Sequence, residues 1–465
     1  MTTITSPREL AAAYLERFQR DGASDSKRID QLCELATSPD AAVARAASAA
    51  IFGGVVEFLA DQFEPRLCGL YVRFFCRVID YCRRLPEAKA LDDCLRNFGL
   101  QNEQDLLDRA NKVRRVTARE GINQPALKRI LVLSRVTIGA DVAVTGVVLD
   151  RMKRLSASAE IVLLAGPKTL ALFASDNRIV PLRVDYPRSG TLLDRLNVWA
   201  SLVQVVEAQL AGLSADEFLI LDPDSRLTQL GLLPLTKADQ GYHFFESRSY
   251  QAASADPLGK LTGQWLGEVF GSGDDPDFPF VRLGAPDTLA GASLRRRTRK
   301  PLATINLGVG GRAAKRVGDP FEMNLLRALL EKGYRVVLDR GAGDEELQRS
   351  KRLTDNLNEN GLTIGNIASY LPQDDALTDV MVWEGSLSGF AGFVSASDLY
   401  VGYDSAAGHV AAALGIPVIT VFAGATAGRM IERWSPWGRH HSTVVAVSRD
   451  STPNEVLHSV REQIP

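Results

Sequence analysis

Three short segments of the chain combine small and charged residues in patterns that suit phosphate binding or proton transfer. The most distinctive is VGYDSAAGHV, residues 401–410, which brings together Asp404, Ser405 and His409 after an apolar run. Small side chains let a ligand approach the backbone, and the free amides at a helix start attract phosphate. The segment therefore suits a diphosphate. The alternative is a tight turn in which Asp404 or Ser405 caps the next helix.

A second segment, GVGGRAAKR at residues 308–316, places Lys315 in a loop after an apolar run. It is not the phosphate loop of nucleoside triphosphatases, because Ala314 precedes the lysine where that motif needs Gly. The looser glycine pattern, with Asp339 further on, fits a dinucleotide fold. However, the Asp319–Pro320 pair marks a helix start that is too distant for such a turn. The loop leaves Lys315 free to meet an anion, unless it is only a solvated lysine.

The third segment is SRVTIGADV, residues 134–142, in which Asp141 follows another apolar run. A carboxylate that faces a cleft could act as a general base, and the alternative is a helix cap. The chain has only 5 His, and it shows no H-E-x-x-H motif and no closely spaced Cys pair. We therefore expect no metal and no cofactor.

Alternating β-branched runs and helical segments from Arg129 onward predict two sets of parallel βα units. In such sheets ligands bind at the carboxyl ends of the strands, which is where all three segments lie. The expected strands are residues 130–134, 161–164 and 218–221 in the first set, and 303–307, 334–338, 398–402 and 416–422 in the second.

The N-terminal quarter differs, because apolar residues recur there at helical spacing and all 5 Cys precede Gly121. We expect an all-helical domain over residues 1–122, with buried structural thiols, and a linker at 121–125. The two sheet domains are then expected at 126–295 and 300–465. The basic run at 295–300 is interpreted as a solvated linker, with an anion site as the alternative.

Length and charge exclude several classes of protein. A chain of 465 residues suggests about three domains, and a net charge of −2 argues against a general nucleic-acid binder. The start of the chain lacks a basic and apolar leader. The most apolar stretch, residues 46–60, is shorter than the ~20 residues of a membrane span. These observations predict a cytoplasmic protein without a membrane span.

Together the three segments resemble those of glycosyltransferase family 9, the ADP-heptose:lipopolysaccharide heptosyltransferases. Residues 129–160 are similar to the family's opening strand, Gly-Asp turn and helix, although Ala140 here separates the Gly from the Asp. Lys315 is similar to its phosphate-binding lysine, and GAGDEE at 341–346 to its acidic loop. The most specific likeness is DSAAGH, residues 404–409, followed by AAALGIPV.

The resemblance covers residues 126–465 and implies a GT-B fold, in which two Rossmann-like domains face each other across a cleft. It implies an inverting, metal-independent transfer of a heptose or hexose from a nucleotide-diphosphate sugar. Asp141 would be the base, and Lys315 would offset charge on the leaving diphosphate. The remaining residues that the resemblance assigns to nucleotide-sugar binding are Gly310, Glu345, Asp404, Ser405, Ala406, Gly408 and His409.

The acceptor would be a hydroxyl of a glycan, a lipopolysaccharide or a protein. Two other functions stay open, namely a sugar-nucleotide-binding or scaffold protein without catalysis, and an NAD-type oxidoreductase that rests on residues 308–313 and Asp339. The N-terminal helices are expected to contribute to the choice of acceptor, and they offer a surface for homo-oligomerisation.

Overall fold

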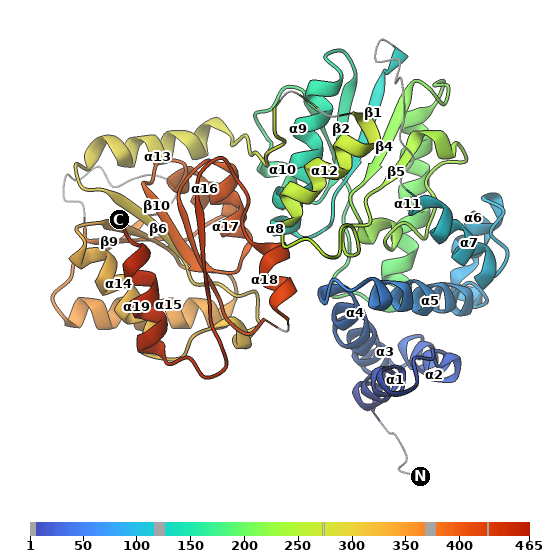
Figure 1. Ribbon diagram of the computed structural model, residues 1–465, viewed down its shortest axis with the longest axis horizontal. Helices are drawn as coiled ribbons and strands as arrows, with labels where there is room; N and C mark the ends of the chain where they lie inside the picture. The colour runs from blue at the N-terminus through green and yellow to red at the C-terminus, as the bar shows by residue number, and fades with distance from the viewer. Residues whose placement is uncertain (1–5, 116–125, 272, 274, 368–377, 426) are drawn as a thin grey trace.

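The computed structural model describes residues 6–115, 126–271, 273, 275–367, 378–425 and 427–465. The predicted linker at 121–125 lies outside these ranges. The first described part is a helical domain, shown in blue in Figure 1. Its elements are α1 (Pro7–Asp21), α2 (Ser26–Ala36), α3 (Ala41–Ala49), η1 (Ala50–Val56), α4 (Glu57–Asp61), α5 (Pro65–Cys82), η2 (Pro86–Ala88), α6 (Lys89–Asn97) and α7 (Glu103–Val113).

Local sequence explains where these helices begin. The Ser6 hydroxyl accepts the amide of Glu9 while the Glu9 carboxylate accepts the amide of Ser6, which satisfies two otherwise unpaired amides at the start of α1. Asn102 and Asp105 do the same for α7. The cysteines lie in this domain, and all except the half-buried Cys94 are buried. Buried free thiols agree with the structural role predicted for them.

Helices α3, η1 and α4 form one continuous run, Ala41–Asp61, whose middle turn is π-helical. Among the described residues this run is the one helix that is long and apolar enough to cross a membrane. Half of its most apolar window is buried inside the protein, and a core helix of a soluble protein meets the same criteria. The absence of a membrane span therefore stays a prediction.

The first sheet domain contains five parallel strands in the order β3-β2-β1-β4-β5. Its strands are β1 (Arg129–Leu133), β2 (Glu160–Ala165), β3 (Ile179–Arg183), β4 (Phe218–Asp222) and β5 (Tyr242–Phe244). Its helical elements are α8 (Ile138–Ala140), η4 (Asp141–Thr145), α9 (Gly146–Leu155), α10 (Pro167–Ala171), α11 (Leu192–Leu210), η5 (Arg226–Thr228), η6 (Asp239–Gly241) and α12 (Leu258–Phe270). The three strands predicted for this half are confirmed.

The second sheet domain contains seven parallel strands in the order β12-β11-β10-β6-β7-β9-β8. The strands are β6 (Leu302–Asn306), β7 (Arg335–Asp339), β8 (Ile364–Ile367), β9 (Val380–Trp383), β10 (Leu399–Tyr403), β11 (Val418–Phe422) and β12 (Ser442–Ala446). The helices are α13 (Ala285–Arg297), η7 (Ala313–Lys315), α14 (Phe321–Glu331), α15 (Asp344–Glu359), α16 (Leu387–Val394), α17 (Ala406–Ala413), α18 (Gly428–Trp434) and α19 (Pro453–Gln463).

Helix α13 packs on the second sheet domain, where it crosses α16 (Figure 1). The two backbones touch at Gly291 and Gly392, because a Cβ at Gly291 would lie only 1.8 Å from the Gly392 carbonyl oxygen. The last turn of α13 contains the first three residues of the basic run at 295–300. The interpretation of the whole run as a linker is therefore wrong, since its first half is helical.

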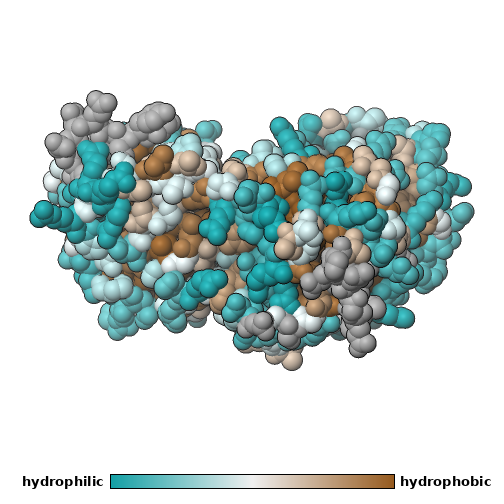
Figure 2. Space-filling model, turned by 90° about the horizontal axis from the view of Figure 1, so that it is seen from above, coloured by the Kyte–Doolittle hydropathy of each residue, from teal (hydrophilic) through white to brown (hydrophobic). Residues whose placement is uncertain are grey.

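The helical domain and one face of the first sheet share a single hydrophobic core. Helix α11 lies between them, and the buried Trp199 contacts Phe98 of the helical domain at 6.0 Å between ring centroids. Figure 1 shows these helices against the first sheet domain. Seen from above, hydrophilic residues cover most of the visible surface (Figure 2).

Helix α18 of the second sheet domain contacts both the first sheet domain and the helical domain. The buried Arg433 guanidinium donates to the carbonyl oxygens of Gln251 and Asp256 at 2.8 and 3.0 Å. Trp434 contacts Phe63 of the helical domain at 6.3 Å between ring centroids. The C-terminal part of the chain therefore also holds the first sheet domain in place.

Candidate functional site

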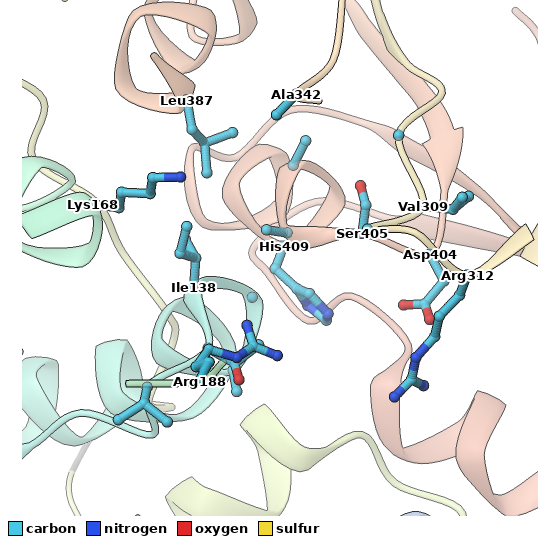
Figure 3. Close-up of a pocket in the computed structure, with 18 of the residues that line it drawn as sticks. Ile138, Lys168, Arg188, Val309, Arg312, Ala342, Leu387, Asp404, Ser405 and His409 are labelled. Atoms are coloured by element: carbon cyan, nitrogen blue, oxygen red, sulfur yellow. The ribbon is translucent and has the colours of Figure 1, made fainter. Parts of the chain in front are cut away.

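A cavity of about 930 Å³ lies where the carboxyl ends of both sheets face each other. The loops after β6, β7, β9 and β10 line it from the second sheet domain, and those after β1, β2 and β3 line it from the first. Figure 3 shows Lys168, Ile138 and Arg188 opposite Leu387, Ser405 and His409. The strand-end rule for parallel sheets therefore holds for both halves.

Lys315 and Asp404 meet in this cavity. The Lys315 ammonium donates to an Asp404 carboxylate oxygen, and it lies 3.4 Å from the Asp404 carbonyl oxygen. An ammonium has three donors, so one stays available for a phosphate oxygen. Because Asp404 pairs with this lysine, the alternative in which Asp404 only caps a helix is wrong.

Helix α17 points its N-terminus at the cavity, as predicted for residues 404–409. Ser405 is the residue before the helix, but its hydroxyl donates to the Asn306 side chain at 3.3 Å and caps no amide. Ala406 also lines the cavity. Gly408 does not, because it faces Tyr400 and Thr420 of the sheet.

His409 lines the cavity while only 5% of its surface is exposed. Burial lowers its pKa to about 4, against a weaker opposite effect of Asp404. The imidazole is therefore neutral at pH 7. Its ring lies against Gly139, where a Cβ would come within 3.3 Å of the imidazole. Gly139 thus lets the first sheet domain approach α17 closely.

The acidic loop differs from expectation. Glu345 pairs with Arg316, its side chain is 62% exposed, and it does not line the cavity. Its neighbour Glu346 does, and it accepts the amides of Val309 and Ala342 at 2.9 Å each. At the start of this helix, only one of two successive carboxylates faces the cavity. The resemblance assigned that position to Glu345, whereas the structure places Glu346 there.

Glu346 also accepts the amide of Gly310 at 3.2 Å. Gly310 lines the cavity as predicted and has φ +61°, a conformation that favours Gly. Glu346 thereby holds the loop 307–315 in place. Glu346 is the last residue of the GAGDEE segment at 341–346, but the resemblance assigned the binding role to its neighbour Glu345.

Asp141 is the main correction to the predicted site. Its carboxylate is completely buried and does not line the cavity. It accepts the hydroxyls of Ser134 and Thr169 at 2.7 Å each and the amide of Arg135 at 2.6 Å. Burial raises its pKa, and these hydrogen bonds oppose the rise. Because its oxygens are occupied and shielded, this geometry argues against the predicted base.

Cationic side chains line the first-domain side of the cavity, and all except Arg135 lie outside the three sequence segments. Lys168 and Arg188 are exposed and point into it (Figure 3). The others on this side are Arg135, Arg195, Arg226 and Arg248. Lys168 and Arg188 follow β2 and β3, so the strand-end rule could have identified them.

The helical domain supplies the remaining wall of the cavity. Ala49, Phe52, Gly53, Val56, Glu57 and Asp61 line it. The Arg195 guanidinium lies 3.8 Å from the Phe52 ring centroid, and Arg312 of the loop after β6 pairs with Glu57. Within the described ranges, no group of three or more His, Cys, Asp or Glu side chains could hold a metal ion.

Comparison with known proteins supports the predicted resemblance. Residues 321–464 match the model of glycosyltransferase family 9 (heptosyltransferase). This match covers most of the second sheet domain. It confirms the resemblance to that family and, with it, the prediction of a glycosyltransferase. No curated protein sequence matches the chain.

A solved structure shows the same fold. A glycosyltransferase of family 9 from Veillonella parvula is 14% identical, with a TM-score of 0.51 over 69% of this chain and 86% of that chain. The ADP-heptose lipopolysaccharide heptosyltransferase II of E. coli is 15% identical, with a TM-score of 0.47 over 72% of this chain and 98% of that chain. The predicted GT-B arrangement with an extra helical region is confirmed.

Proposed function

We propose that the chain transfers a sugar, a heptose or a hexose, from a nucleotide-diphosphate sugar to an acceptor hydroxyl. The observation that carries this proposal is the cavity between the two sheets, where Lys315 lies beside the N-terminus of α17. A fixed ammonium and free helix amides suit a leaving diphosphate, on which negative charge develops during transfer. The family match at residues 321–464 supports the same chemistry.

The transfer is proposed to invert the anomeric centre and to need no metal. Lys315 and the amides of α17 supply positive charge where a metal ion would otherwise be required. If this is correct, chelation with EDTA leaves the transfer rate unchanged, and the product has the opposite anomeric configuration to the donor sugar. A rate that collapses with EDTA and returns with one added metal would contradict metal independence.

The acceptor is proposed to carry carboxylate or phosphate groups. The first-domain side of the cavity is lined by more cations than anions, and the exposed Lys168 and Arg188 point into the space (Figure 3). Such a surface favours an anionic acceptor over a neutral one by electrostatic attraction that weakens as salt is added. A glycan, a lipopolysaccharide or a protein could present such groups.

A thermal-shift screen with ADP-, GDP- and UDP-sugars, followed by a transfer assay with each donor that binds, tests the function. A cognate donor raises the melting temperature because it binds only the folded chain. The K315M variant should lose about 10²–10³-fold in kcat, the usual effect of removing one donor to a developing oxyanion. Lys351, which is 65% exposed and pairs with Asp355 outside the cavity, provides the control K351M.

Unchanged transfer by K315M would contradict the role of the lysine. Binding of a nucleotide sugar without any turnover would favour the second candidate, a binding protein that does not catalyse transfer. The burial of Asp141 is the specific observation in favour of that candidate. Robust turnover by the wild-type protein would eliminate it.

A further inference from the structure

Sugar transfer to a hydroxyl requires a group that takes the hydroxyl proton. Asp141 does not reach the cavity, since its carboxylate is completely buried. It accepts hydrogen bonds from the Ser134 and Thr169 hydroxyls and from the Arg135 amide. Within the described ranges, the other carboxylates and imidazoles that line the cavity are Glu57, Asp61, Asp339, Glu346, Asp404 and His409.

Four of these six lie in the second sheet domain and are engaged there. Asp404 pairs with Lys315, and Glu346 holds three loop amides. Asp339 accepts the Asn306 side chain and the Gly341 amide. His409 has a pKa lowered to about 4 by burial, which makes it a weak base at pH 7. These groups suit the donor side of the reaction.

Glu57 and Asp61 come instead from the helical domain, opposite the loop that carries Lys315. The Glu57 side chain is 44% exposed and pairs with Arg312, which precedes Lys315 by three residues in that loop. Asp61 is 28% exposed and lies 3.9 Å from the same guanidinium. Arg312 therefore places the Glu57 carboxylate at the cleft between the acceptor side and the phosphate-binding loop.

The helix surface beside Glu57 is open to an acceptor. Gly53 lies one turn before Glu57 on the same side of the helix, lines the cavity, and would have no atom within 4 Å of an added Cβ. The surface of Phe52 and Val56 continues this wall. Gly53 therefore leaves room for an acceptor beside the Glu57 carboxylate.

We propose that Glu57 of the helical domain is the general base, an inference that rests on the proposed glycosyl transfer. An oxygen of the Glu57 carboxylate takes the acceptor's hydroxyl proton while the acceptor oxygen bonds to the anomeric carbon. The bond from that carbon to the diphosphate breaks, and its electron pair leaves with the diphosphate oxygen beside Lys315. The half-exposed carboxylic acid then returns its proton to water.

The test compares E57Q with R312Q at saturating donor and acceptor. Both variants break the Glu57–Arg312 ion pair, but only E57Q removes the carboxylate. We expect E57Q to lose about 10²–10⁴-fold in kcat, the usual contribution of a general base, with the donor-induced thermal shift unchanged. R312Q should lose less kcat than E57Q, because the Glu57 carboxylate remains in the cavity although Arg312 no longer holds it in place. E57A should regain activity when formate is added, since formate can replace the lost carboxylate.

Equal losses in E57Q and R312Q, without rescue of E57A by formate, would show that only the ion pair matters and would overturn the proposal. A larger kcat loss in D61N than in E57Q would assign the base to Asp61 and overturn the assignment of Glu57. If the wild type transfers sugar and E57Q is fully active, this inference is overturned while the proposed function stands. No transfer by the wild type with any nucleotide sugar overturns the proposed function and this inference together.

Discussion

At the scale of single residues, the buried His409 makes the free energy of unfolding depend on pH. Its folded-state pKa of about 4 lies below the ~6.5 of an exposed histidine. Between these values the unfolded chain binds a proton that the native chain does not, so the free energy of unfolding falls as pH falls from about 6.5 to 4. The full contribution amounts to about 3 kcal/mol.

Replacing His409 with Gln should remove this part of the pH dependence, which urea denaturation at pH 7, 6, 5 and 4 measures. The matched control is H458Q, because His458 is 76% exposed on the last helix. The control should keep the wild-type slope. If H409Q and the wild type lose the same stability between pH 7 and 4, the imidazole is not kept neutral by burial.

Residue types in strand-end loops identified most residues of the site, but they could not show which side chains point into the cavity. Lys315, Asp404 and His409 line the cavity as predicted. Asp141 and Glu345 do not, since a helix start presents only some of its residues to the ligand. Which residues those are depends on the rotation of the helix about its axis, and that rotation follows from packing against distant parts of the chain.

At the scale of elements, the crossing of α13 and α16 has no room for a side chain. A Cβ at Gly291 would overlap the Gly392 carbonyl oxygen, so G291A must push the two helices apart. We expect a loss of about 1–3 kcal/mol in the free energy of unfolding, the usual effect of overpacking.

Urea denaturation of G291A, with L289A as its control on the same helix, measures this effect. Leu289 is 62% exposed, so its truncation should leave stability within about 0.5 kcal/mol of the wild type. An unchanged midpoint for G291A would mean that the helices do not meet at these two glycines.

Hydrophobic periodicity predicted β1, β2, β4, β6, β7, β10 and β11, because a strand buried on both faces is a short run of apolar residues. It did not identify β3, β5, β8, β9 and β12. Residues 242–285 are rich in Gly, Pro and Asp and gave no clear pattern, although they contain β5 and α12. The basic run at the end of α13 is typical of a linker by composition alone. Its helical conformation comes from the contact with α16, which lies about a hundred residues further along the chain.

At the scale of the whole molecule, the helical domain is not separable from the first sheet domain. Their shared core includes Trp199 of α11, whose indole also donates to the Pro234 carbonyl at 2.7 Å. We expect the fragment 126–465 to aggregate, because removing the helices exposes the apolar face of α11. Solubility on expression and size-exclusion chromatography measure this.

Coexpression of residues 1–115 with that fragment should restore a soluble complex, since it covers the same face again. A soluble, monomeric 126–465 fragment with a cooperative thermal transition would contradict the shared core. Composition marked a boundary near residue 122, because all 5 Cys precede Gly121. It gave no sign that the two parts share a core, because the apolar residues of one helical face do not reveal which surface they contact.

The shared core also determines how the cleft can open. If the helical domain and the first sheet domain move as one body, opening separates that body from the second sheet domain and breaks the contacts of Arg433. Glu57 would then leave with the first body, while Arg312 and Lys315 stay with the other. Proton transfer and departure of the diphosphate would thus be available together only in the closed arrangement, which would protect a bound donor from water until an acceptor is in place.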